Sequence, residues 1–361
     1  MSRLLEKLQK NSTIKDTDVL SDSKFFNKKD MIPTPVPILN VALSGRLDGG
    51  LVPGHTMWAG ESKHFKTGFA LLMAKAYLDK YKDAILLFYD SEFGTPKSYF
   101  QSFGIDTKRT LHTPLTDIEQ LKFDIMAQMK DIHRDDHIII VIDSIGNLAS
   151  KKEIDDAEAG KSTADMTRAK QLKSLFRMIT PHLTLKNIPL ITVNHTYMEI
   201  GLFPKAIVGG GTGSYYSADN IFIIGRQQVK VDTDLKGFNF IINVEKSRYV
   251  REKSKIPVTV SFESGISKWS GLLDIALEGQ FIAKPSNGWY SKVDQVTGEM
   301  EPKKYRFDDT QNEEFWNPIL QSKKFQDYII KEYAIGYGDI LNTPEKETVD
   351  ASQKKEDKKK S

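Results

Sequence analysis

The segment GESKHFKT, from Gly60 to Thr67, comes within one residue of a phosphate-binding loop. Such a loop reads G-x-x-x-x-G-K-[ST] and joins a strand to the N-terminus of a helix, where free N–H groups and partial positive charge favour phosphate. Lys66 would reach the β- and γ-phosphates of a nucleotide, and Thr67 would bind Mg²⁺. The pattern predicts a nucleotide-binding loop formed by Gly60, Glu61, Ser62, Lys63, His64, Phe65, Lys66 and Thr67.

Phe65 stands where this pattern has its second glycine. Glycine permits close backbone approach to a ligand and a positive φ. We expect Phe65 to be accommodated if its φ stays negative and its ring points away from the phosphates. The alternative is a polar strand-to-helix turn in which the Lys-Thr pair is a coincidence.

Acidic side chains follow two other apolar runs. Asp143 ends "IIIVID", so its carboxylate would lie at the C-terminal edge of a buried strand, where open α/β sheets bind ligands and a metal water shell can be held. Glu92 in "FYDSEFG" would orient or deprotonate an attacking water. Asp90 is the competing candidate, and we interpret it as a loop charge.

Asn194 and His195 leave a further apolar strand in "ITVNHT". A single histidine at a strand end usually serves as a hydrogen-bonding residue. In a parallel sheet this one would point to the same edge as Lys66 and Asp143. The sequence shows no His/Cys/Asp cluster with zinc spacing and no nucleophile-elbow pattern.

The elements that must position these residues alternate between strands and helices. Apolar runs predict strands near 56–59, 84–89, 138–142 and 189–193, and helical spacing predicts helices near 67–81, 117–132 and 164–179, the last ending near Pro181. This alternation indicates an α/β fold with a mostly parallel sheet. The runs 221–225, 238–244 and 257–262 predict antiparallel strands added to one side.

Bulk composition excludes several classes of protein. The 361 residues have a net charge of +3, which does not by itself indicate a nucleic-acid partner. There is no cysteine, so disulfides and thiolate metal sites are excluded. No run approaches the roughly 20 apolar residues that span a bilayer, and residues 1–11 have amphipathic helix spacing. We expect a cytoplasmic protein with no membrane partner.

The order GESKHFKT, YDSE, IIIVIDS, TVNH and VEKSR resembles that of the RecA-family DNA strand-exchange recombinases, especially their T4-type bacteriophage subgroup. Further phrases such as "IDSIGNLASKKE", "GGGTG" and "SADNIFIIG" extend the resemblance from about residue 20 to 290, and more weakly to 333. The resemblance implies a RecA-like P-loop ATPase core that binds ATP and Mg²⁺. It also implies a homo-oligomeric helical filament on single-stranded DNA that pairs with double-stranded DNA.

The resemblance assigns roles to individual residues. Lys66 and Thr67 match the phosphate-binding Lys and the Mg²⁺-binding hydroxyl, Asp143 the second metal-site acid, and Glu92 the catalytic glutamate. His195 stands where the γ-phosphate-sensing glutamine is expected. Asn194 matches the family asparagine, and Tyr99 the tyrosine that stacks on adenine, although one residue is inserted before it. Phe65 departs from the general loop but resembles the bacteriophage subgroup.

Two basic residues, Lys246 and Arg248 in "EKSR", match side chains that reach ATP from the neighbouring subunit. Cations supplied in this way would stabilise charge on the transferring phosphoryl group. Without the resemblance, a solvated strand face would be the better interpretation.

The resemblance places DNA contacts in two loops, about 150–166 and 196–213. Neither loop is a basic patch. The predicted contacts are Arg168, Lys205, Phe203 or Ile207 as a wedge between bases, and the backbone of Gly209, Gly210 and Gly211.

We predict four regions. Residues 1–33 form an oligomerisation segment and linker with Phe25 and Phe26 as candidate anchors, 34–270 the core, 271–341 a small C-terminal domain, and 342–361 a disordered charged tail. The alternatives are a RecA-fold helicase and a non-catalytic mediator or scaffold with a defective nucleotide site. A mediator, a single-strand binding protein and a helicase of the same phage are the expected protein partners, and the host cytoplasm the expected location.

Overall fold

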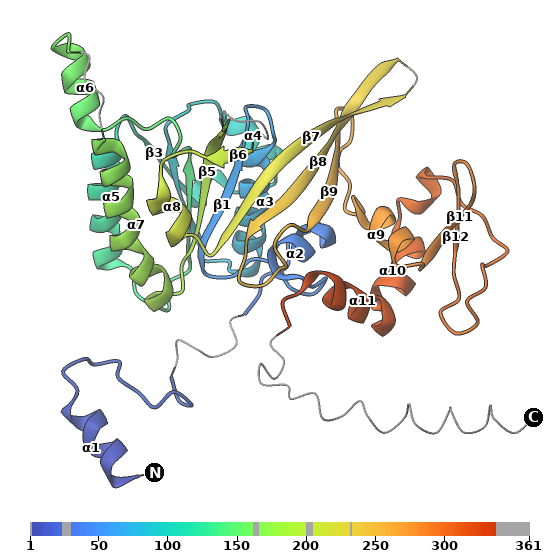
Figure 1. Ribbon diagram of the computed structural model, residues 1–361, viewed down its shortest axis with the longest axis horizontal. Helices are drawn as coiled ribbons and strands as arrows, with labels where there is room; N and C mark the ends of the chain where they lie inside the picture. Colours follow the sequence, from blue (N-terminus) through green and yellow to red (C-terminus); the bar gives the residue numbers. More distant parts are fainter. Residues whose placement is uncertain (1, 24–29, 162–165, 200–204, 232, 337–361) are drawn as a thin grey trace, which may run out of the picture.

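The predicted loop lies at the C-terminal ends of the parallel strands of a ten-stranded sheet (Figure 1). The computed structural model describes residues 2–23, 30–161, 166–199, 205–231 and 233–336. The strands of the sheet are β1 (Gly54–Gly60), β2 (Ile85–Asp90), β3 (Thr110–Pro114), β4 (Ile138–Asp143), β5 (Pro189–Met198), β6 (Ala206–Val208), β7 (Asn220–Val231), β8 (Asp234–Lys246), β9 (Lys255–Ser261) and β10 (Gly265–Ile266).

The strand order is β10-β9-β8-β7-β1-β5-β4-β2-β3, with β6 paired to β5. The strands from β7 to β3 in this order are parallel, and β8, β9 and β10 add an antiparallel flank. This confirms the α/β fold with a mostly parallel sheet and antiparallel additions. In the parallel part Gly60 pairs with His195 and Asp90 with Asp143, so the residues expected at the site leave the sheet at one level.

Helices cover both faces of the sheet. They are α2 (Pro37–Ser44), α3 (Lys66–Lys80), α4 (Lys97–Ser102), α5 (Ile118–Asp131), α7 (Thr167–Leu185) and α8 (Thr212–Ser217). Two further helices, α1 (Arg3–Asn11) and α6 (Lys151–Glu158), have no buried residues and do not cover the sheet. Alternate residues of each strand enter different cores, since Trp58 and Phe88 lie in the cluster with α3 while Met57 and Tyr89 lie in the cluster with α5 and α7. The central strands β1, β2 and β4 are therefore buried along almost their whole length, as their sequences indicate.

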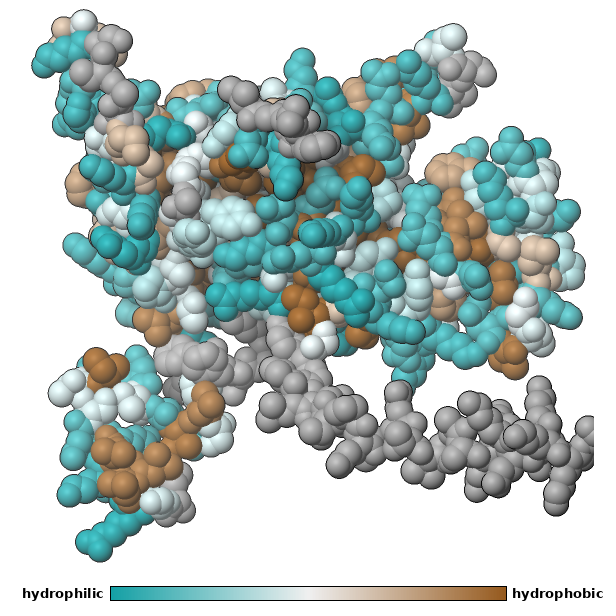
Figure 2. Space-filling model, viewed as in Figure 1, coloured by the Kyte–Doolittle hydropathy of each residue, from teal (hydrophilic) through white to brown (hydrophobic). Residues whose placement is uncertain are grey.

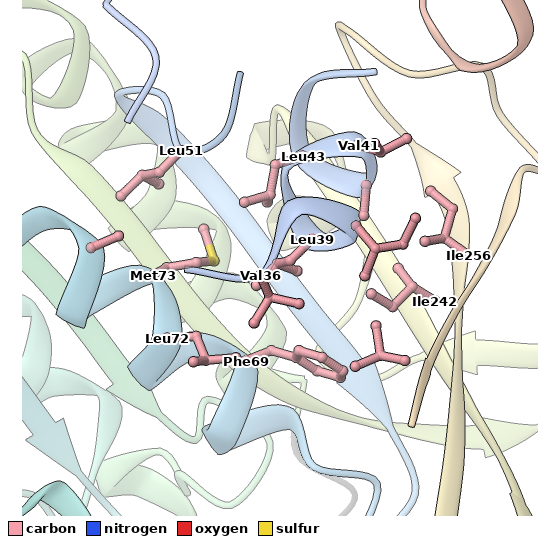
Figure 3. Close-up of a cluster of buried hydrophobic side chains, with 14 of the residues drawn as sticks. Val36, Leu39, Val41, Leu43, Leu51, Phe69, Leu72, Met73, Ile242 and Ile256 are labelled. Carbon is pink, nitrogen blue, oxygen red and sulfur yellow. The ribbon is translucent and has the colours of Figure 1, made fainter. Parts of the chain in front are cut away.

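Apolar side chains of α2 tie the N-terminal side of the core to the antiparallel flank. Figure 3 shows Val36 and Leu39 beside Phe69 of α3 and Ile242 of β8. All four side chains are buried. This contact connects the helix that follows the phosphate loop with the strand that ends at Lys246.

The chain after the sheet forms a smaller unit with α9 (Leu272–Glu278), β11 (Ile282–Ser286), β12 (Trp289–Lys292), α10 (Glu313–Gln321) and α11 (Lys323–Tyr333). Residues 284–290, KPSNGWY, form the β11–β12 hairpin around Gly288, whose φ is +74°. The boundary at residue 271 stays a prediction.

Helix α7 differs from its prediction, because it continues through Pro181 to Leu185. Its apolar face stays buried on both sides of Pro181 along the chain: Ile179 before the proline and Leu183 after it are buried. Burial of that face against the sheet outweighs the lost backbone hydrogen bond.

Helix α1 is amphipathic, as its spacing predicts, and none of its residues is buried. Leu4 and Leu8 are 63% and 59% exposed, and apolar atoms gather on this segment in Figure 2. Docking of this segment on a neighbouring copy stays a prediction. Phe25, Phe26 and the tail at 342–361 lie outside the described residues.

Candidate active site

The phosphate loop joins β1, which ends at Gly60, to α3, which begins at Lys66. Phe65 has φ +57° and ψ +21°, a left-handed conformation that glycine adopts more readily than any other residue. The expectation of a negative φ is therefore wrong. The ring does turn inward, however, where it stacks on Phe240 at a centroid distance of 5.5 Å and meets Phe69 edge-on at 5.4 Å. These aromatic contacts offset the cost of the backbone conformation.

Gly68, one turn into α3, provides the space for this ring. A β-carbon at Gly68 would lie 2.3 Å from Cε1 of Phe65. The glycine missing from the loop thus has a counterpart three residues later, which the loop pattern alone does not reveal.

Lys66 is buried, with 6% of its surface exposed, and its Nζ donates a hydrogen bond to the carbonyl oxygen of Glu61 at 2.7 Å. Burial lowers the pKa of this lysine, and the nearby carboxylates of Glu92 and Asp143 oppose that shift. The ammonium group therefore lies inside the loop, facing the two acids that the sequence placed at the same edge.

Thr67 and Asp143 meet directly, because the Thr67 hydroxyl donates to Oδ2 of Asp143 at 2.7 Å. The other oxygen, Oδ1, is buried and has no hydrogen-bond partner among the described residues. Burial raises the pKa of Asp143 to about 6; the Thr67 hydrogen bond opposes this, and the Glu92 and Asp90 carboxylates add to it. A hydroxyl beside an unpaired buried carboxylate oxygen is a donor set that suits Mg²⁺ and its water shell.

Glu92 and His195 form the next pair, with His195 Nε2 2.9 Å from Glu92 Oε1. The hydrogen bond to His195 holds the pKa of Glu92 below its usual value, against the opposing effect of its partial burial. Both side chains are about one-third exposed, so water can reach them. A partly hydrated carboxylate in this position can accept a proton from water.

Asp90 has a different environment from Glu92. It is buried, and its Oδ1 accepts hydrogen bonds from the backbone N–H groups of Glu92 and Phe93 at 3.0 and 2.8 Å. Its Oδ2 lies 3.1 Å from Nε2 of His112 on β3. These contacts make Asp90 the residue that holds the Glu92 turn.

A serine pair that we did not single out connects the two acidic strand ends. The Ser91 hydroxyl donates to the carbonyl oxygen of Ser144 at 2.7 Å and accepts from its N–H at 3.0 Å. Each serine is next to an acid of the site, Ser91 to Glu92 and Ser144 to Asp143. The signal for this pair in the sequence was an acid next to a serine at the end of both strands.

Asn194 does not face the phosphate loop. Its side chain is fully buried, its Nδ2 donates to the carbonyl oxygen of Gly209 at 2.8 Å, and its Oδ1 accepts from the N–H of His195. These contacts do not support the predicted cofactor contact, because both ends of the amide bond to the protein. Asn194 instead ties His195 to the loop that follows β5.

Tyr99 lies on α4, where its ring packs edge-on against Phe103 at 5.1 Å. Phe103 is also the neighbour of Phe65, at 6.3 Å. The tyrosine is therefore on the α3 side of the loop, and its contact with adenine stays a prediction.

Lys246 and Arg248 lie at the N-terminal ends of the parallel strands, whereas Lys66 lies at their C-terminal ends. Lys246 pairs with Ile221 at the start of β7, and Asn220 there pairs with Thr56 at the start of β1. From Thr56 to Gly60 the strand rises about 13 Å, at roughly 3.3 Å per residue. Arg248 forms an ion pair with Asp219 at 2.6 Å. These two cations therefore stand apart from the site of their own chain.

Comparison with known proteins agrees with this arrangement. Residues 5–267 match the RecA N-terminal domain, and residues 269–329 match the C-terminal domain of the bacteriophage T4 recombination and repair protein. The chain is 48% identical to the recombination and repair protein of Enterobacteria phage T4 over all of this chain and 93% of that protein.

This chain belongs to the RecA family. It is also 27% identical to protein RecA of Syntrophus aciditrophicus, over 72% of this chain and 74% of that protein. With protein RecA of Francisella philomiragia the identity is 25%, over 87% of this chain and 86% of that protein. Among the described helices of this RecA-family chain, none is long and apolar enough to cross a membrane.

The first loop of this RecA-family chain contains helix α6, and residues 162–165 lie outside the described residues. Arg168, at the start of α7, donates hydrogen bonds to the carbonyl oxygens of Leu148, Ile145 and Gly146 at 2.8–2.9 Å. This geometry does not support the predicted DNA contact, because the guanidinium is used to hold the chain that follows Asp143.

The second loop contains β6 and the N-terminus of α8. The N–H of Gly209 donates to the carbonyl oxygen of His195 at 2.9 Å, so it has a partner within the chain. The phosphate contacts of Gly209, Gly210 and Gly211 stay predictions. Gly210 and Gly211 have φ of +87° and +76° and pack against α7. Lys205 is exposed, whereas Phe203 lies outside the described residues. The contacts of Lys205 and Phe203 with DNA stay predictions.

Proposed function

We propose that this RecA-family protein is an ATP-dependent recombinase that forms a filament on single-stranded DNA and exchanges strands with a homologous duplex. The observation that carries the proposal is the convergence of Lys66, Thr67, Asp143 and Glu92 at one edge of the sheet, with His195 bonded to Glu92. The family and the T4 relative support a role in recombination and repair.

The residues of the site divide the work of hydrolysis. Bound ATP would supply the transferable phosphoryl group, and Mg²⁺ would neutralise its charge. Thr67 and Asp143 would hold the metal, and the ammonium group of Lys66 would stabilise the β- and γ-phosphate oxygens. Glu92 would accept the proton of the attacking water, with His195 fixing the orientation of its carboxylate.

A neighbouring copy would complete the site. Lys246 and Arg248 lie far from their own phosphate loop, which supports the role that the resemblance gives them at the loop of the next subunit. In such a head-to-tail assembly, the side of one copy that carries Lys246 would face the phosphate loop of the next copy. Repetition of this contact without closure into a ring would give a helical filament. Hydrolysis would then depend on filament formation.

ATP and DNA binding are coupled through His195. This residue contacts Glu92 through its ring and Gly209 through its carbonyl oxygen, while Asn194 bonds to the same glycine. A change at the γ-phosphate would therefore bias the order of the loop that we expect to bind DNA. If single-strand affinity did not change on removal of ATP, this coupling would be wrong.

Two alternatives lose support. A scaffold with a defective nucleotide site rested on Phe65, whose ring points away from the loop, while Lys66 and Asp143 lie as a functional site needs. A RecA-fold helicase is disfavoured by the 48% identity to the T4 recombination and repair protein over all of this chain.

ATPase assays with and without single-stranded DNA test the proposal, together with a strand-exchange assay. We expect DNA to stimulate the wild-type protein. Lys66→Ala should lose both activities, and Glu92→Gln should lose hydrolysis by about 100-fold or more while it still binds ATP and DNA. Lys80→Ala, an exposed lysine at the end of α3, is the matched control and should keep both activities. ATP hydrolysis that is not stimulated by DNA and is not lost in Lys66→Ala would refute the proposal.

On the likeness to the T4 protein we place this activity in the cytoplasm of an infected host. A mediator that loads the recombinase, a single-strand binding protein and a helicase of the same phage are the partners we propose. Pull-down with each purified phage protein would test them one at a time.

A further inference from the structure

We propose that Phe93 of each protomer inserts into an apolar groove of the next protomer of the filament. The groove lies between β5–β6 and α8. This inference rests on the proposed function, because it assumes the head-to-tail contact that brings Lys246 to a neighbour's nucleotide.

Phe93 is presented to solvent beside the candidate catalytic glutamate. Its side chain is 61% exposed, and its φ of +55° is unusual for a bulky residue. Asp90 maintains this conformation by accepting the N–H groups of Glu92 and Phe93, and His112 bonds to Asp90 in turn. A buried carboxylate therefore holds an aromatic ring outward, and strain of this kind is typical of functional positions.

The groove has a volume of about 290 Å³ and is lined by Tyr197, Ala206, Ile207, Val208, Tyr215 and Ile223. Its lining is mainly apolar, with charged residues Glu199, Lys205 and Glu245 around it. An apolar hollow with a polar rim is the form of pocket that receives an aromatic anchor in protein interfaces.

Two contacts within the chain connect the groove to the filament interface. The Nζ of Lys246 donates to the carbonyl oxygen of Tyr215 at 3.0 Å and lies 5.7 Å from the centre of its ring. Glu92 and Phe93 are consecutive. Bringing Lys246 of one copy to the nucleotide beside Glu92 of another therefore brings the groove beside Phe93.

The ring does not fill the groove of its own chain. Phe93 follows β2, which is separated from β5 by β4, whereas the groove lies on the β7–β8 side of β5. A second copy of this chain is the occupant that has both the exposed ring and the required position.

Cross-linking between two single variants tests the contact, since the natural chain has no cysteine. Phe93→Cys and Ile207→Cys proteins would be mixed with single-stranded DNA, Mg²⁺ and a non-hydrolysable ATP analogue, and treated with a short bis-maleimide. We expect a covalent dimer from the mixture and none from either variant alone. The control mixture contains Phe262→Cys in place of Phe93→Cys, together with Ile207→Cys. Phe262 is as exposed as Phe93, at 61%, and this mixture should give no dimer.

Assembly measurements provide a second readout. Because the ring is exposed in the monomer, Phe93→Ala should unfold like the wild type. Its ATP-dependent assembly on single-stranded DNA should need about tenfold more protein, the loss expected of an interface anchor, and Phe93→Leu should recover much of it. An assembly midpoint within twofold of wild type would overturn the inference.

The outcomes separate the two proposals. If the wild type assembles on DNA with ATP but the mixed variants do not cross-link, only the Phe93 contact is wrong. If the wild type does not assemble, the proposed function fails and the contact fails with it. If DNA protects Ile207→Cys from maleimide in the Phe93→Ala background, a nucleotide base occupies the groove, and the inference is overturned.

Discussion

Asp143 shows how burial prepares a single side chain for a ligand. Its carboxyl is 2% exposed, shares a hydrogen bond with Thr67, and keeps one oxygen unpaired among the described residues. The charged form is disfavoured in the unliganded protein, and a bound cation would reverse that. The folded protein therefore carries a local cost that Mg²⁺ with nucleotide relieves.

Asp143→Asn should stabilise the unliganded protein at neutral pH. The folded pKa of about 6 lies above the ordinary value, so the folded state binds more protons and stability falls as pH rises from about 4 to 6. Removing the charge should raise the free energy of unfolding by about 1–3 kcal/mol at pH 7.5, with little difference below pH 4. Urea unfolding at both pH values checks this.

The control for this experiment is Asp135→Asn, an exposed carboxyl far from the loop, whose unfolding should match wild type. A variant at position 143 that is less stable than wild type at pH 7.5 would contradict the prediction. Addition of Mg²⁺ and ATP should stabilise the wild type but not the variant, because only the wild type retains the metal-binding carboxylate.

At the scale of the secondary-structure element, the phosphate loop packs against the helix α3 that follows it. The ring of Phe65 occupies the space that a β-carbon at Gly68 would need. A loop that lacks its usual glycine therefore still turns, because packing against Phe69 and Phe240 offsets the strained backbone.

A double-mutant cycle tests this fit. Gly68→Ala alone should destabilise the protein by about 1–3 kcal/mol, because its methyl group would overlap the Phe65 ring. In a Phe65→Ala background the same change should be neutral or stabilising, since alanine favours a helix over glycine by about 1 kcal/mol. Urea unfolding of the four proteins gives the coupling energy. Additive effects would show that the ring is not what Gly68 accommodates.

For the whole molecule, the sheet separates the two groups of residues that we propose to act at one site. Lys66, Asp143 and Glu92 lie at its C-terminal edge, while Lys246 is at the other edge and bonds to the carbonyl oxygens of Tyr215 and Tyr216. In the proposed head-to-tail assembly, each copy would contribute one half to each of two sites, and the filament would be the functional unit.

Mixing two inactive variants should restore activity. Glu92→Gln would lack the carboxylate that we propose to activate water, and Lys246→Ala would lack the cation that we propose to be supplied to a neighbour. In a random equal mixture, about a quarter of head-to-tail contacts join an intact Glu92 to an intact Lys246. We expect about a quarter of the wild-type DNA-dependent ATPase, measured over a range of mixing ratios.

The comparison for this experiment is a mixture of Glu92→Gln with Lys66→Ala. Both changes are on the same half of the site, so no contact in that mixture has an intact Lys66–Glu92 half, and activity should stay at the background level. Recovery in that mixture, or none in the first, would contradict a site shared between copies.

The parallel α/β sheet and the edge at which Lys66, Glu92 and Asp143 meet were predictable from the sequence. Apolar strands buried on both faces leave a strong local signal, and the polar residues that follow them must emerge at a common edge. The path of α7 beyond Pro181 was not predictable, because burial of its far end overrides the local effect of proline.

The partners of Asn194, Arg168 and Gly209 could be found only in the tertiary structure. Their residue types permit contacts with a ligand or with the protein, and the choice depends on which carbonyl oxygens the fold places nearby. The left-handed backbone of Phe65 has the same origin, because its ring packs against Phe240, far along the chain. Periodicity and motif order determine the elements and their edge, whereas contacts between distant segments determine which side chains remain available for chemistry.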